Sequence, residues 1–173
     1  ALMQAVGEGD MRAFEQIVHR YQSAAWRVAW RYVGDADEAE DMVQETFLRL
    51  LDAAERYRPT AAFRTYFYRI LTRLCMDHGR KKRPILTDSL PETPAPGPTQ
   101  AERVERQERE RAVRRSLDAL PPKYRLAVVM RYFEGLSGAE IAEAMKTTPK
   151  AVERLLARAR RRLEPLLEPL REF

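Results

Sequence analysis

A segment in the C-terminal third carries basic side chains at a spacing suited to nucleic-acid binding. Four of them stand four residues apart and would share one face of a helix: Lys150, Arg154, Arg158 and Arg162. Residues 146–162 hold seven basic residues and a single acid, Glu153. A solvated helix usually mixes charges of both signs, so this excess favours contact with phosphates and base edges over an ordinary solvated face.

Two helices and a tight turn would hold this basic face at a fixed angle. Ser137 suits the N-cap of a short helix, and Thr148 followed by Pro149 suits the start of the next. Apolar residues at three- and four-residue spacing predict the buried side of the second helix: Val152, Leu155 or Leu156, Ala159 and Leu163. This is the pattern of a helix-turn-helix, whose second helix enters the major groove. Lys146 stands in the turn where glycine would suit a left-handed backbone.

Aromatic and basic residues are interleaved in a third predicted helix that ends near residue 82. Rings stack on unpaired bases while arginines follow phosphates, so this composition suits single-stranded nucleic acid. Some of the rings must be core, because they recur at helical spacing with leucine and isoleucine. Tyr66 and Tyr68 cannot both share the core face, so we expect at least one of these two rings to be exposed. The basic run over residues 80–83 also fits an ordinary helix C-terminus.

Charge is distributed unevenly in the N-terminal half. Residues 34–45 hold six acids and no base, whereas residues 56–83 hold nine bases and one acid. The net charge of +5 over 173 residues is modest by comparison. This separation suggests at least two partners of opposite electrostatic character. Acids favour helix N-termini, so the acidic stretch is interpreted as a helix start and not as a set of metal ligands.

The residue types that enzymes use are sparse in this chain. Its two histidines, His19 and His78, lie far apart in the sequence, and its one cysteine, Cys75, offers no zinc-ligand spacing. No glycine-rich phosphate loop follows a predicted strand. We therefore predict a non-enzymatic protein that needs no cofactor. A single cysteine excludes an intramolecular disulfide and fits a reducing cytoplasm, and no apolar run reaches membrane-spanning length.

Nearly the whole chain is predicted to be helical. Helices are expected over residues 10–32, 35–54, 61–82, 100–120 and 121–134, followed by the helix-turn-helix. A proline-rich stretch, which cannot be helix, separates the third of these helices from the fourth. We predict an all-α fold of two small helical domains, residues 1–83 and 100–173, joined by a flexible linker over residues 84–99.

Two motifs, in this order, resemble conserved regions of one protein family. The sequence Asp-Glu-Ala-Glu-Asp-Met-Val-Gln-Glu-Thr-Phe-Leu at residues 37–48 is similar to the second region of bacterial RNA polymerase sigma factors. Residues 117–125, 131–137 and 140–142 are similar to the fourth region. The missing domain between them is typical of the compact extracytoplasmic-function group.

The resemblance implies three binding surfaces. One would dock on the coiled coil of the largest catalytic subunit of core RNA polymerase, through Asp41, Gln44, Glu45 and Leu48. A second would recognise and melt the minus-ten promoter element and hold its unstacked bases, through Phe63, Arg64, Tyr66, Tyr68, Arg69, Arg73, Arg80, Lys81 and Arg83. The third would read duplex DNA at the minus-thirty-five element, through Lys150, Ala151, Arg154, Arg158 and Arg161.

The resemblance also implies a cellular role. The chain would be a cytoplasmic, promoter-specificity subunit of bacterial RNA polymerase for a stress- or signal-responsive set of promoters. An anti-sigma factor would hide its surfaces, and a membrane-bound anti-sigma factor would be its one route to membrane contact. The linker would thread toward the active centre and the RNA exit path of the polymerase.

The chain departs from the family pattern at several positions. Tyr66-Phe67 replaces the usual tryptophan-leucine, and Arg73 replaces asparagine, which affects the expected minus-ten base preference. Lys146 replaces the turn glycine, so the turn should be wider or strained. The run Ala151–Leu155 differs from the common threonine-valine-lysine-serine-arginine, so base contacts cannot be transferred.

Two other classes of protein stay open at this stage. A stand-alone helix-turn-helix regulator would dimerise and bind duplex without polymerase, although the sequence has no heptad seam for dimerisation. A sigma-like decoy would bind an anti-sigma factor but would not melt promoters.

Overall fold

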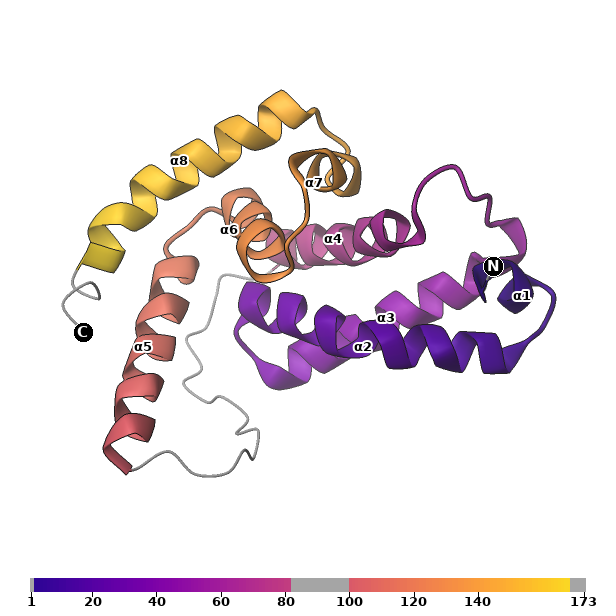
Figure 1. Ribbon diagram of the computed structural model, residues 1–173, viewed down its shortest axis with the longest axis horizontal. Helices are drawn as coiled ribbons and strands as arrows, with labels where there is room; N and C mark the ends of the chain where they lie inside the picture. Colours follow the sequence, from indigo (N-terminus) through magenta and orange to yellow (C-terminus); the bar gives the residue numbers. More distant parts are fainter. Residues whose placement is uncertain (1, 82–99, 169–173) are drawn as a thin grey trace.

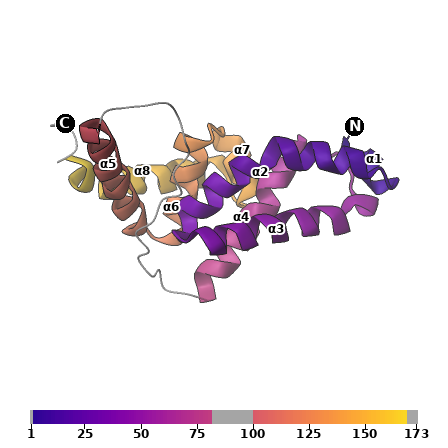
Figure 2. The same cartoon turned by 90° about the horizontal axis from the view of Figure 1, so that it is seen from below.

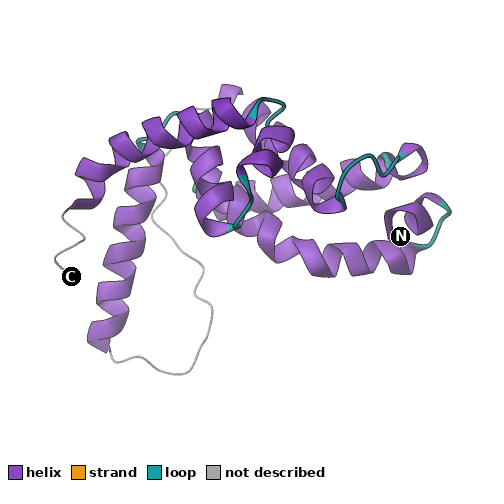
Figure 3. Cartoon of the chain, turned by 45° about the horizontal axis from the view of Figure 1, so that its top comes forward, coloured by secondary structure: helices purple, strands orange, loops and turns teal. Residues whose placement is uncertain are grey.

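The structure, a computed structural model, describes residues 2–81 and 100–168, except for the side chains of residues 80, 81 and 100–102. This part of the chain contains helices and turns but no strand, which confirms the all-α prediction (Figure 3). The α-helices are α1 (Leu2–Gly7), α2 (Met11–Val33), α3 (Ala36–Asp52), α4 (Phe63–Lys81), α5 (Gln100–Asp118), α6 (Pro122–Val128), α7 (Gly138–Ala144) and α8 (Pro149–Leu167). The predicted linker, residues 84–99, lies entirely outside the described residues.

Helices α2, α3 and α4 pack against one another, and α1 lies at one end of α2 (Figure 1). Asp10 caps α2 by accepting hydrogen bonds from the backbone N–H groups of Arg12 and Ala13. Asp35 caps α3 in the same way, accepting from the N–H of Glu38 at 2.9 Å. The predicted starts of these two helices are therefore confirmed, whereas α1 was not foreseen.

Helix α8 packs against α6 and α7, and α7 and α8 form the helix-turn-helix. Ser137 and Glu140 make a reciprocal capping box at the start of α7, and Thr148 caps α8. Lys146 adopts φ 51° in the turn, the left-handed backbone that glycine would adopt without strain. The predicted buried stripe is confirmed, with Leu156 and not Leu155 as its second member: Val152, Leu156, Ala159 and Leu163.

The helix predicted over residues 121–134 is not uniform. Its first part is α6, and it continues as a π-helical turn over Val129–Phe133, in which the N–H of Glu134 donates to the carbonyl of Val129 at 3.3 Å. A π-turn rotates the following residues relative to an α-helix. The spacing of apolar residues in the sequence could not predict the π-turn, because one wider turn hardly changes that spacing.

The N-terminal and C-terminal helices pack directly against each other. Helix α4 contacts α6 and α7, and α2 contacts α5 and α6 (Figures 1 and 2). One buried apolar cluster continues from Phe67 and Leu71 of α4 to Leu126 of α6 and Met130 of the π-turn. Thr72 donates from its hydroxyl to the Met130 sulfur at 3.6 Å within this interface. None of the helices among the described residues is long and apolar enough to cross a membrane.

Candidate nucleic-acid and partner interfaces

The predicted docking residues share one face of α3. Asp41, Gln44 and Leu48 are exposed, and the half-buried Glu45 pairs with Arg49 at 2.7 Å. Leu48 is 57% exposed, a high value for a leucine in a helix whose opposite side is buried. An exposed leucine among polar and acidic groups gives this face an apolar anchor together with negative charge, which suits a basic helical partner.

The predicted reading face of α8 is open to solvent. Lys150, Arg154, Arg158 and Arg161 are exposed, and Ala151 is half-buried. None of these four cations forms an ion pair with another described residue. Their charges are therefore available to phosphates or base edges.

An aromatic cluster occupies the N-terminal end of α4. Tyr66 is half-buried, with its ring edge-on to Tyr57 at 5.0 Å between centroids and near Phe63 at 6.5 Å. Phe63 in turn packs edge-on against Tyr21 at 5.3 Å. The cluster is a set of rings at the surface of the bundle, a platform on which unstacked bases can be held.

Tyr68 corrects one expectation from the sequence. It is 2% exposed, and its hydroxyl donates to the Glu134 carboxylate at 3.3 Å. Burial, followed by the nearby Glu134 charge, raises the pKa of the Tyr68 phenol, which keeps the proton on this donor. Of the pair in which at least one ring was expected to be exposed, Tyr68 is therefore buried and Tyr66 is half-buried. Tyr66 packs against Tyr57 and Phe63, and the Tyr68 hydroxyl bonds to Glu134, 66 positions further along the chain.

The predicted arginines of α4 are divided between contacts within the protein and solvent. Arg64 donates to the Glu134 carbonyl at 2.6 Å and lies 3.5 Å from the Glu140 carboxylate. Arg69 pairs with Glu143 at 2.6 Å, whereas Arg73 is exposed. The side chains of Arg80 and Lys81, and all of Arg83, lie outside the described residues.

A cleft brings two of the predicted surfaces together. Its volume is about 880 Å³, and it lies between α4 on one side and α7 and α8 on the other. Its lining contains one acid, Asp77, and six cations: Arg69, Arg73, Lys123, Lys146, Arg154 and Arg158. Apolar side chains also line it: Ile70, Met76, Ala144, Met145, Ala151 and Leu155. Residues predicted for the minus-ten and the minus-thirty-five elements thus share one basic cleft, whereas Phe63 and Tyr66 do not line it.

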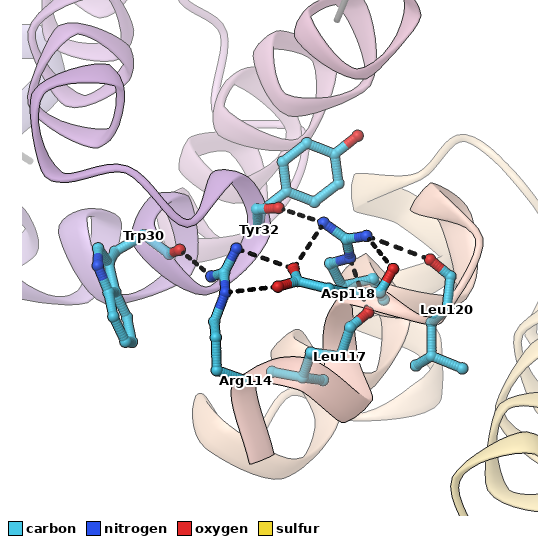
Figure 4. A network of polar contacts seen from close by, with 7 residues as sticks. Trp30, Tyr32, Arg114, Leu117, Asp118 and Leu120 are labelled. Atoms are coloured by element: carbon cyan, nitrogen blue, oxygen red, sulfur yellow. Dashed lines mark hydrogen bonds and ion pairs between the residues drawn. The ribbon is translucent and has the colours of Figure 1, made fainter. Parts of the chain in front are cut away.

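Two arginines that the sequence did not single out, the buried Arg125 and the half-buried Arg114, join the C-terminal helices to the end of α2 (Figure 4). Arg114 donates to the carbonyl of Trp30 at 2.6 Å, and Arg125 donates to that of Tyr32 at 2.7 Å. The Trp30 carbonyl also accepts from the N–H of Gly34, the C-cap of α2, and the two guanidinium groups add further donors to the last carbonyls of this helix. Asp118 lies between them, 2.9 Å from Arg114 and 3.4 Å from Arg125.

The backbone next to this network leaves room for Arg114 only because residue 34 is glycine. Gly34 adopts φ 83° at the C-cap of α2, and a Cβ there would overlap the Arg114 guanidinium. Burial lowers the pKa of Arg125, while the neighbouring Asp118 charge opposes that shift. An arginine stays charged nonetheless, so the network is an ionic link between the two sets of helices.

The described residues contain no group of three or more histidine, cysteine or acidic side chains placed to hold a metal ion. Cys75 is fully buried, and burial raises the pKa of its thiol to about 12. A buried thiol of that kind is a packing residue and not a nucleophile.

Comparison with known families gives two matches in the expected order. Residues 17–85 match Sigma-70 region 2, and residues 110–163 match Sigma-70 region 4. The chain is 33% identical to the RNA polymerase sigma-H factor of Pseudomonas aeruginosa, over 98% of this chain and 93% of that protein. It is 31% identical to the ECF RNA polymerase sigma factor SigW of Bacillus subtilis, over 95% and 94% of the two chains.

Solved structures show the same arrangement of helices. CnrH, determined in complex with the cytosolic domain of CnrY, is 28% identical with a TM-score of 0.75, over 97% of this chain and 96% of that one. The sigma factor RpoE of Bartonella quintana, determined in complex with the anti-sigma factor NepR, shares the fold at 19% identity and a TM-score of 0.63, over 90% and 96%. The chain therefore belongs to the extracytoplasmic-function group of RNA polymerase sigma factors, the non-enzymatic subunits that bind core polymerase and direct it to promoter DNA.

Proposed function

We propose that this sigma factor uses a different surface for each step of initiation. The exposed face of α3 binds core polymerase, the aromatic and basic residues of α4 hold the melted minus-ten strand, and α8 reads the minus-thirty-five duplex. The observation that carries the proposal is the basic face of α8, where four exposed cations form no ion pair with another described residue and project from a well-capped helix-turn-helix. In a stand-alone regulator, the aromatic residues proposed to hold the melted strand and the face proposed to bind polymerase would have no function.

Transcription in a defined system tests this role. The chain is added to sigma-free core polymerase with a library of genomic promoter fragments, and run-off transcripts are sequenced. We expect transcripts from a specific subset of promoters that depend on the added chain. A stand-alone regulator would bind duplex without polymerase and give no transcripts. A decoy would neither bind duplex nor give transcripts.

The docking face of α3 is tested by changing two of its residues. Gln44→Ala with Glu45→Lys removes a polar contact and reverses one charge on an exposed face. We expect affinity for core polymerase to fall about tenfold or more, because a charge reversed at an interface replaces attraction with repulsion. Fluorescence anisotropy of the labelled chain with core measures this, and circular dichroism checks that helicity is intact. Binding as tight as that of the unchanged protein would place the docking surface elsewhere.

The reading face of α8 is tested at Arg158, which is exposed on the cleft side of the helix. A bidentate arginine–guanine contact contributes roughly 1–3 kcal/mol of discrimination, whereas a phosphate contact weakens binding to all sequences alike. Arg158→Ala should therefore reduce binding to minus-thirty-five duplex by about tenfold. Electrophoretic mobility shifts on the cognate and a scrambled duplex measure the difference. An equal loss on both duplexes would make Arg158 a phosphate contact.

The cleft between α4 and α8 suits a regulatory protein partner. Six cations and an apolar lining match an amphipathic helix with acidic residues, the chemistry we assign to an anti-sigma factor. CnrH, the similar protein described above, was itself determined with a protein partner bound. Because a polymerase subunit works beside the chromosome, we place the protein in the bacterial cytoplasm, with membrane contact only through a membrane-bound anti-sigma factor.

A further inference from the structure

Three glutamates of the C-terminal helices lie against the face of α4 that carries the proposed minus-ten residues. Glu134 contacts Arg64 and Tyr68, Glu140 lies beside Arg64, and Glu143 pairs with Arg69. These glutamates come from the end of the π-turn and from α7, on the side that packs against α4. These three glutamates thus contact the arginines of α4 that DNA phosphates would otherwise contact.

Glu134 is the centre of this contact. Its side chain is 4% exposed and accepts from Arg27 of α2 through both carboxylate oxygens, at 3.1 and 3.0 Å. The Tyr68 hydroxyl donates to the same carboxylate, and Arg64 donates to the backbone carbonyl. A bidentate arginine pair is among the stronger polar contacts, and here it joins α2 to the π-turn. The wider turn over Val129–Phe133 precedes Glu134 and sets where it points.

We propose that Glu134, Glu140 and Glu143 form an internal latch that competes with DNA for α4. In the latched form the helix-turn-helix lies on α4, Tyr68 is buried, and Arg64 and Arg69 are neutralised. The melted strand needs the same arginines, so the latch and the strand cannot occupy them together. The proposed competition with DNA rests on the assignment of α4 to the minus-ten strand. The proposal that the glutamates hold the helix-turn-helix against α4 does not depend on that assignment.

Because only open molecules can bind, the apparent affinity of α4 for nucleic acid equals its intrinsic affinity multiplied by the open fraction. The docking face of α3 stays exposed in the latched form, because Asp41, Gln44 and Leu48 lie outside the contact. Core polymerase can therefore bind the latched form, before the strand-binding surface is released.

The closure is tested by measuring a distance between the two sets of helices. Spin labels are attached at Gln22→Cys on α2 and Glu153→Cys on α8, both exposed positions, in the full chain. The native Cys75 is buried and does not compete for label. We expect one narrow distance distribution by pulsed electron paramagnetic resonance, which Glu134→Ala replaces with a broad one at longer distances. Glu105→Ala is the matched control, since it removes an equal charge from an ion pair within α5.

The competition is tested with a fluorescein-labelled oligothymidylate of about 20 nucleotides, which probes stacking and phosphate contacts without base readout. If nine-tenths of the molecules are latched, Glu134→Ala should tighten binding about tenfold. Adding Arg64→Ala to Glu134→Ala should remove most of that gain, because the gain depends on cations of α4 and not of α8. Should Glu134→Ala not fold, Glu143→Lys at an exposed position tests the contacts between these glutamates and the arginines of α4.

An unchanged distance distribution in folded Glu134→Ala would show that the apolar packing and the Arg114 and Arg125 contacts hold the helices together without Glu134, and the latch would be overturned. Opening without tighter oligothymidylate binding would overturn the competition instead. That second result would place the strand-binding surface outside α4, so it separates a failure of the latch from a failure of the assigned function.

Discussion

Arg125→Ala should lower the free energy of unfolding by about 3–5 kcal/mol, the usual cost of removing one partner from a buried ionic network. Arg125 is 6% exposed and donates to the backbone carbonyls of Tyr32, Leu117, Asp118 and Leu120 at 2.7–3.3 Å. Alanine would leave these carbonyls without their donor and would leave a cavity in the interface. Urea denaturation followed by circular dichroism measures the loss.

The matched control is Arg106→Ala on α5, where the ion pair with Glu110 is exposed to solvent. That change should cost less than about 0.5 kcal/mol. The two tryptophans of the chain, Trp26 and Trp30, lie on α2, and Arg114 lies over the Trp30 ring at 5.5 Å. Tryptophan emission therefore reports separately on the contact between α2 and the C-terminal helices. If Arg125→Ala matched Arg106→Ala in stability and kept the native emission, the contact between the end of α2 and the C-terminal helices would not depend on Arg125.

Tyr66→Ala should leave the closed promoter complex largely formed but slow or abolish promoter opening. Opening requires that unstacked bases be held, and a base stacked on an aromatic ring contributes roughly 1–3 kcal/mol by alanine substitution. Closed-complex binding rests instead on phosphates and on the recognition helix. Tyr66 lies at the surface of the aromatic cluster with Tyr57 and Phe63, so its loss should leave the core of the bundle folded. Permanganate footprinting of duplex promoter with the holoenzyme measures opening.

Two comparisons make the Tyr66→Ala result specific. A promoter with a pre-melted bubble should partly rescue the variant, because the cost of unstacking has been removed. Tyr132→Ala, which removes a tyrosine ring that is 56% exposed and lies outside α4, should open promoters normally. Normal opening by folded Tyr66→Ala would make Tyr66 a packing residue and would transfer melting to Phe63, Tyr68 or Arg73.

Local sequence determined where most of the helices begin and which side of each is buried. Asp10, Asp35, Ser137 and Thr148 each accept a hydrogen bond from a backbone N–H two or three residues further along the chain. Such caps, and the apolar stripe of α8, depend on neighbours within one or two helical turns. The exposure of the α3 docking face and of the α8 cations could be predicted for the same reason.

Only the tertiary structure decided which of the candidate residues lie free and which are covered. The buried Tyr68 bonds to a carboxylate 66 positions away, and Arg125 bonds to a carbonyl 93 positions away. The cleft that joins Arg73 of α4 to Arg158 of α8 likewise requires the two sets of helices to pack together. Helical periodicity shows which side of a helix is apolar, but it does not show which distant helix covers the other side. That choice depends on shape, charge and hydrogen bonding across the whole interface, to which the buried apolar cluster, Glu134, Arg114 and Arg125 contribute here.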